Sequence, residues 1–190
     1  MRLKNRYFLL RHGDTTWTRT DLIYPLFDSQ KVKLTKVGRK QIFTVAKRLK
    51  KESIDKIYSS DFYRTKQTAE IVAKELNLRV NFDKRLRDIN LGIYHGKTKE
   101  QFYRDFPNLA KRFRIGPPKG ESWDTVKRRM GDFLREIEKK YWNKNILIVS
   151  HGDPLWLLEG VARRLTNQQL LDKIFLKGEY IKKGELRKLI

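Results

Sequence analysis

Two short apolar runs, far apart in the sequence, are each followed by one polar residue and then by the same three residues, His-Gly-Asp. The first run, 7–10, is followed by Arg11 and His12, and the second, 146–149, is followed by Ser150 and His151. Four consecutive apolar residues bounded by polar ones are typical of a buried strand. The chain has only three histidines, and two of them directly follow its two most strand-like segments.

Helix-like segments separate the strand-like ones. Thr35 and Ser122 can each cap a helix with an apolar face, and Pro154 suits the first turn of another. A capping box at Thr98 predicts a short helix that ends before Pro107. The remaining predicted elements are strands at 54–58 and 79–82 and a helix that ends near Asn77. Alternating strands and helices predict an α/β fold, here a three-layer α/β/α sandwich with a mostly parallel central sheet.

The length of 190 residues fits one domain with a sizeable core. We therefore expect residues 1–190 to form a single domain whose recognisable motifs lie within 7–165. Residues 166–190 would be a C-terminal extension or supply the final strands, and the part from Gly178 has the pattern of a weak hairpin.

The sequence gives little sign of export or of a membrane. No segment approaches the roughly 20 apolar residues of a membrane span. Basic residues at 2, 4 and 6 precede only four apolar residues, fewer than the ~7–15 of a signal-peptide core. With zero cysteines, disulfides and thiolate metal sites are excluded. We expect a cytoplasmic protein without a membrane partner, and the oligomeric state stays open.

The charge is strongly positive, with 44 basic and 22 acidic residues and a net charge of +22. One interpretation is a polyanionic partner such as RNA. The other is a solvated basic surface, which fits basic residues spread along the whole chain. Interleaved aromatic and basic side chains could bind RNA or could pack as a lid; they are Phe102, Tyr103, Arg104, Phe106, Lys111, Arg112, Phe113 and Arg114.

The ends of the predicted strands bring polar side chains to one edge of the sheet, where α/β proteins bind ligands. They include Arg11, His12, Arg64 and His151, with Ser60 beside Arg64. Guanidinium groups match phosphate oxygens in pairs, and a helix N-terminus favours an anion. A neutral histidine can attack phosphorus, while a charged one can donate to phosphoryl oxygens.

This set supplies positioning and charge for phosphoryl transfer without a metal. His-x-Asp occurs twice, which leaves a metal site as an alternative, but the spacing is not that of the common zinc motifs. We therefore expect neither a metal nor another cofactor. Asp14 and Asp153 are interpreted as turn residues or helix caps.

Five segments in order resemble the histidine phosphatase superfamily, the phosphoglycerate-mutase-like proteins, and its phosphatase branch. They read LLRHGDTTW, YSSDFYRTKQTAEIVA, LRDINLGIYHGKT, PPKGESW and ILIVSHGDP, and the likeness extends over 7–165. The resemblance implies that His12 is the nucleophile that becomes a phosphohistidine and that Gly13 orients its ring. It also implies that the phosphate is held by Arg11, Arg64, His151, Thr18 and Gly13, and that His151 and Asp88 contribute to catalysis.

Three positions depart from the family pattern. Asp88 stands where a glutamate usually donates the proton, and its side chain is one methylene shorter. Thr18 occupies the position of an asparagine that commonly contacts phosphate. His95 replaces a glutamate and is either an alternative proton donor or a structural residue.

The resemblance implies a metal-independent phosphomonoester hydrolase that acts through a phosphohistidine on a small phosphorylated metabolite. A phosphoglycerate mutase is the alternative within the family, although the donor segment differs from the mutase-type ERHYGGL. An RNA- or polyanion-binding module is the alternative from another class. Specificity would come from 22–30 and 97–116, and the physiological substrate stays open.

Overall fold

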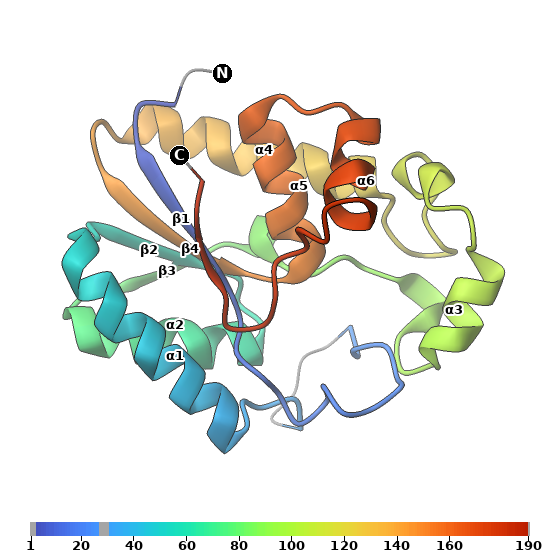
Figure 1. Cartoon of the computed structure of the whole chain (residues 1–190), viewed down its shortest axis with the longest axis horizontal. Coiled ribbons are helices and arrows are strands. Elements are labelled where there is room, and N and C mark those ends of the chain that lie inside the picture. The colour runs from blue at the N-terminus through green and yellow to red at the C-terminus, as the bar shows by residue number, and fades with distance from the viewer. Residues whose placement is uncertain (1–2, 27–30, 190) are drawn as a thin grey trace.

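The computed structural model describes residues 3–26 and 31–189, and part of the predicted specificity segment 22–30 therefore lies outside the described residues. In the described part, five strands form one sheet in the order β3-β2-β4-β1-β5 (Figure 1). β1 to β4 run parallel, and β5 is antiparallel to β1. The strands are β1 (Arg6–Arg11), β2 (Lys56–Ser59), β3 (Val80–Phe82), β4 (Asn145–Ser150) and β5 (Leu186–Lys188).

Helices cover both faces of the sheet (Figure 1). Phe8 and Leu10 pack in the cluster that includes α1 and α2, whereas Tyr7 and Leu9 pack in the cluster of α4 and α5. Successive side chains of a strand point to opposite faces, so an apolar run such as 7–10 is buried on both sides. The predicted three-layer α/β/α fold is confirmed. These helices are α1 (Lys36–Leu49), α2 (Tyr63–Leu76), α4 (Trp123–Lys140) and α5 (Gly152–Arg163).

The predicted helix starts are confirmed by their capping bonds. The Gly38 amide donates to Thr35 Oγ1, and the Thr125 amide donates to Ser122 Oγ. Thr98 begins α3 (Lys99–Asp105) by accepting from the Gln101 amide. Four 3₁₀ turns connect the described elements: η1 (Lys50–Glu52), η2 (Lys84–Leu86), η3 (Gly92–Tyr94) and η4 (Ala110–Phe113).

A separate small cluster lies beside the sheet edge, around α3 (Figure 1). Ile23, Tyr94 and Phe102 form its buried centre, and Phe106 packs against it. The rings of Tyr94 and Phe102 meet edge to face at 5.3 Å. Most of the aromatic side chains interleaved with basic ones in 102–114 are therefore packed, as expected for a lid.

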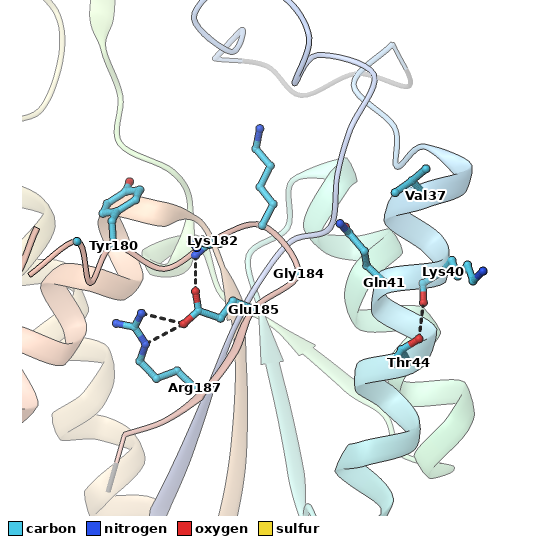
Figure 2. A pocket seen from close by; sticks show the side chains of 11 residues that line it. Val37, Lys40, Gln41, Thr44, Tyr180, Lys182, Gly184, Glu185 and Arg187 are labelled. Carbon is cyan, nitrogen blue, oxygen red and sulfur yellow. Dashed lines mark hydrogen bonds and ion pairs between the residues drawn. The ribbon is translucent and has the colours of Figure 1, made fainter.

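The C-terminal segment differs from the predicted hairpin, and that prediction was wrong. After α6 (Asn167–Phe175), the chain crosses to the free edge of β1 and adds the single strand β5. Gly184, with φ +70°, turns the chain beside Gln41 of α1 (Figure 2). Its amide donates to the carbonyl oxygens of Arg11 and His12, at 3.2 and 3.0 Å. The edge of β1 offers unpaired backbone groups, so the tail pairs there rather than with itself.

None of the helices in the described ranges has both the length and the apolar character needed to cross a membrane.

Candidate active site

His12 directly follows β1 and is 1% exposed. Its Nδ1–H donates to the Gly13 carbonyl oxygen at 2.9 Å, which leaves the lone pair on Nε2. Burial, together with the positive charges of Arg64 and Arg11, holds the pKa of His12 well below its usual range. The imidazole is therefore neutral near pH 7, with Nε2 able to act as a nucleophile.

The turn after His12 depends on glycine because α1 approaches it closely. A Cβ on Gly13 would lie 2.8 Å from the Gly38 carbonyl oxygen, and a Cβ on Gly38 would lie 2.1 Å from the Asp14 carbonyl oxygen. The Asp14 carboxylate accepts from Thr35 Oγ1, the cap of α1, at 2.8 Å. This packing fixes the backbone that orients the His12 ring.

His151 follows β4 and meets His12 ring to ring, with centroids 5.4 Å apart. Its Nε2 lies 2.9 Å from Ser60 Oγ, and its Nδ1 lies 3.5 Å from Asp88 Oδ2. The Ser60 hydroxyl already accepts from the Phe62 amide and can donate its own hydrogen to Nε2. The proton of the neutral ring then sits on Nδ1, opposite the carboxylate. Burial and the nearby charges of Arg64, His12 and Arg11 lower the pKa of His151.

Arg11 and Arg64 supply the positive charge of the site. Arg64 is completely buried in the first turn of α2, and its NH2 group donates to Asp88 Oδ2 at 2.9 Å. Arg11 donates to the Ile181 carbonyl oxygen at 2.9 Å. Within residues 3–26 and 31–189, Nε of Arg11 and Nδ1 of His151 are buried nitrogens without a hydrogen-bond partner. Buried nitrogens of this kind favour a bound anion that would accept from them.

Arg11, His12, Arg64 and His151 form a cationic cup, and Asp88 lies at its edge beside Arg64 and His151. Its side chain is 23% exposed, and Oδ1 accepts from the Ile89 amide. The carboxylate thus contacts the buried Arg64 and His151 on one side and is open to solvent on the other. The shorter aspartate therefore reaches the position beside His151 and Arg64 despite the missing methylene.

His95 is held by both ring nitrogens. The Leu91 amide donates to Nε2 at 2.9 Å, so the proton lies on Nδ1 and is donated to the Tyr24 carbonyl oxygen at 2.6 Å. Both positions are occupied by backbone partners. Nε2 also lies 3.0 Å from Asn90 Oδ1, and this bonding on both sides of the ring corresponds to the structural alternative for His95.

Thr18 belongs to a hydroxyl network at the rim of the site. Its Oγ1 accepts from the Thr15 amide at 3.1 Å and from Lys183 Nζ at 2.9 Å. It also lies 3.1 Å from Thr15 Oγ1 and 3.5 Å from the Tyr24 hydroxyl. A hydroxyl has one hydrogen and two lone pairs, so these neighbours occupy its full capacity. A direct bond from Thr18 to phosphate would need this network to rearrange.

Sequence reasoning missed three residues that shape the site, all of them outside the motifs or treated as turn residues. Lys183 and Tyr180 come from the tail, and Tyr180 lies against Arg11 at 5.4 Å. Asp153 is half-buried and accepts from the Tyr180 hydroxyl at 2.6 Å and from Trp123 Nε1 at 3.1 Å. Burial raises the pKa of Asp153. The residues of this tail carry no local pattern that could have revealed their position.

The five motif segments and their geometry agree with the family comparison. The family model described as histidine phosphatase superfamily, branch 1, matches residues 7–173. The chain belongs to the histidine phosphatase superfamily. Among curated relatives of this histidine phosphatase, phosphoserine phosphatase 1 from Hydrogenobacter thermophilus is 32% identical over 79% of this chain and 72% of its own length. The probable phosphoglycerate mutase GpmB from Yersinia enterocolitica is 36% identical over 80% and 71%.

Solved structures of related proteins share the whole architecture. A mycobacterial glucosyl-3-phosphoglycerate phosphatase superposes with a TM-score of 0.83 and 25% identity, covering 98% of this chain and 90% of its own. YhfR from Bacillus stearothermophilus superposes with a TM-score of 0.81 and 28% identity, covering 97% and 90%. Relatives named as phosphatases and relatives named as mutases both occur, so membership in the superfamily alone does not distinguish hydrolysis from phosphoryl transfer within the substrate.

Proposed function

We propose that this chain is a metal-independent phosphomonoester hydrolase that forms a phosphohistidine at His12 and acts on a small phosphorylated metabolite. The observation that carries the proposal is the orientation of His12. Its Nδ1–H is bound by the Gly13 carbonyl, so Nε2 presents a lone pair beside Arg11 and Arg64. Relatives named as phosphatases support the same reaction class.

The first step is phosphoryl transfer to the protein. Arg11, Arg64 and the Nδ1–H of His151 donate to the phosphoryl oxygens, so the anion supplies partners for Arg11 Nε and His151 Nδ1. His12 Nε2 then forms a bond to phosphorus as the bond from phosphorus to the ester oxygen breaks. The Asp88 carboxyl group gives its proton to the departing alkoxide, which leaves as an alcohol.

The second step returns the enzyme to its starting state. A water molecule attacks phosphorus and gives a proton to the Asp88 carboxylate, while the bond from phosphorus to His12 Nε2 breaks. Inorganic phosphate leaves. The cationic cup stabilises the equatorial oxygens in both transition states without contributing atoms to either product.

The position of Asp88 suits proton transfer to the leaving group. In the free enzyme, the carboxylate is paired with Arg64 at 2.9 Å. Asp88 is assigned as the donor because both nitrogens of His95 are engaged by backbone groups.

Hydrolysis of p-nitrophenyl phosphate in the presence of a chelator tests the proposal. The wild type should retain full activity, and His12→Ala should have none above background. Loss of wild-type activity on chelation, or full activity of the variant, would exclude this mechanism.

A phosphoglycerate mutase is the second candidate, because a mutase-named relative reaches 36% identity. NMR of 3-phosphoglycerate with bisphosphoglycerate separates the two reactions. Release of inorganic phosphate supports the hydrolase, whereas the 2-phospho isomer without free phosphate supports the mutase.

A cytoplasmic location stays a prediction, which cell fractionation would check. Binding of RNA also stays a prediction, and it would require an affinity that falls steeply with salt concentration.

A further inference from the structure

The phosphate cup opens into a much larger chamber of about 800 Å³. Apolar side chains from three parts of the chain line it, including Tyr24, Leu91, Phe102, Phe106, Leu109 and Phe175. The chamber and the cup share Arg11, Arg64 and Asp88, so an ester group bound in the cup would place its alcohol part in the chamber. A volume of this size accommodates a body far larger than that of serine or glycerate.

Charged groups that line the chamber beyond the cup already have partners. Glu121 pairs with Arg129 at 2.9 Å, and Lys99 Nζ donates to the Thr20 carbonyl oxygen at 2.8 Å. Arg112 donates through two nitrogens to the Phe106 carbonyl oxygen. Its guanidinium also lies 4.6 Å from the ring centre of Phe102. Contacts within the protein thus hold these charged side chains in place, and the rest of the chamber lining is mainly apolar.

We infer that the preferred substrate is a monoester whose phosphate is its only charged group and whose alcohol part is an alkyl or aryl body of about six carbon atoms or more. This inference rests on the proposed hydrolase function. Transfer of each methylene from water into an apolar site is favourable, so a longer chain should bind more tightly until the chamber is filled.

A series of n-alkyl phosphates from methyl to octyl tests this inference, because the leaving alkoxide changes little along it. We expect kcat/KM to rise about fourfold for each added methylene. Octyl phosphate should also exceed phosphoserine and 3-phosphoglycerate. A flat series, or a preference for either carboxylate-bearing substrate, would overturn the inference while leaving the hydrolase function intact. Absence of turnover that depends on His12 for every ester would instead overturn the function.

Exposed residues at the chamber allow a matched test with little risk to folding. Phe175 and Ile115 line the chamber and are each 57% exposed, whereas Trp142 is 70% exposed and lies outside it. Phe175→Asp with Ile115→Asp should lower the octyl-to-methyl ratio of kcat/KM at least about tenfold, since two charges replace apolar contact area. Trp142→Asp should leave the ratio unchanged. Equal ratios in both variants would contradict the inference.

A second inference concerns the tail and stands on separate contacts. Lys183 Nζ donates to Thr18 Oγ1 at 2.9 Å, and the next residue, Gly184, is bonded to the carbonyl oxygens of Arg11 and His12. The position of Lys183 is thus fixed by the backbone that carries the nucleophile. Its positive charge is also close enough to contribute to the lowered pKa of His12.

The geometry points to Lys183 as an additional phosphate ligand in the proposed hydrolase. An ammonium group has three hydrogens, and Thr18 takes one of them. The hydroxyl of Thr18 has no spare hydrogen, so the lysine can present the donor that the family asparagine would otherwise supply. Lys183 is half-buried, and burial and the charge of Arg11 lower its pKa to about 8. Asp14 opposes this shift, while Lys99 and Arg64 add to it.

Vanadate or inorganic phosphate binding, measured by calorimetry, tests the role of Lys183 against Lys182, the exposed neighbour in the same tail. Lys183→Gln should weaken binding about tenfold or more, as expected for a lost hydrogen bond to a charged group. Lys182→Gln should change it less than about twofold. Wild-type affinity should also fall above about pH 8, as the ammonium loses its proton, more steeply than in Lys183→Gln. Equal weakening in both variants, or identical pH profiles, would overturn this role.

Discussion

The two His-Gly-Asp segments have nearly the same sequence and the same place at the end of a parallel strand, but their contacts differ. The ring of His12 is tied to its own following residue, Gly13, which leaves Nε2 as a nucleophile. The ring of His151 is tied to Ser60 from another strand end, and its Nδ1 faces Asp88. In the proposed mechanism, this difference in bonding makes His12 the nucleophile and His151 a donor to the anion.

The aspartates of the two segments diverge as well. Asp14 binds the capping hydroxyl of α1 and stabilises the start of that helix. Asp153 is half-buried between α4 and the tail, where Trp123 and Tyr180 donate to it. A repeated motif thus gives one site with two different halves, and each half can be tested separately.

Removal of His12 should have the largest effect. We expect His12→Ala to lower kcat by about 10⁴-fold or more, because no other group forms the covalent intermediate. Acid-labile phosphate on the protein, followed by mass spectrometry during turnover, checks the reason for the loss. A phosphohistidine that persists in this variant would contradict the assignment of the nucleophile.

Removal of His151 should have a smaller effect on kcat than removal of His12, and it should not prevent the covalent intermediate from forming. His151→Ala is expected to lower kcat by about 10²–10³-fold, as for one lost donor to a transition-state oxygen. The phosphohistidine at His12 should still form, but slowly. If the adduct were found at His151 in the wild type, the roles of the two segments would be reversed.

The loss of activity on removal of Asp88 should be larger for esters with a poorer leaving group. Asp88→Asn should lower kcat/KM for an alkyl phosphate by about 10²-fold or more, since a general acid no longer protonates the alkoxide. The loss for p-nitrophenyl phosphate should be much smaller, because nitrophenolate leaves without a proton. Equal losses for both esters would indicate that Asp88 is not the proton donor.

The smallest expected effect is on stability and concerns Asp153. Burial raises its pKa above the ordinary value of 3.8, so the folded state binds more protons than the unfolded state as the pH rises from that value. Folding stability from this group is fully present at lower pH and declines with rising pH. Asp153→Asn should therefore gain stability relative to the wild type as the pH rises from about 4 toward neutrality. Denaturant unfolding across this range would measure the trend, and parallel curves would argue against it.

The α/β architecture and the cationic cup could be predicted from the sequence because both depend on local patterns. Apolar runs such as 7–10 predicted strands, Thr35 and Ser122 predicted helix starts, and parallel strands bring their ends to one edge. The separation of His12 from His151 along the chain did not matter, since the sheet pairs Arg11 directly with Ser150.

The bonding of individual side chains could not be predicted in this way. Nothing in the sequence around His95 shows that two backbone groups engage its ring, and nothing in the tail shows that Lys183 reaches Thr18. The chamber likewise needs segments around Tyr24, Phe102 and Phe175 to meet.

The sequence by itself determined the layered sheet, the family and the set of groups that can hold and transfer a phosphoryl unit. Tertiary structure alone decided which histidine nitrogen carries the lone pair, where the tail runs and what surrounds the ester beyond its phosphate. The physical reason is range: strand and helix patterns are set by neighbours along the chain, whereas hydrogen-bond partners and cavity walls come from residues that only folding brings together.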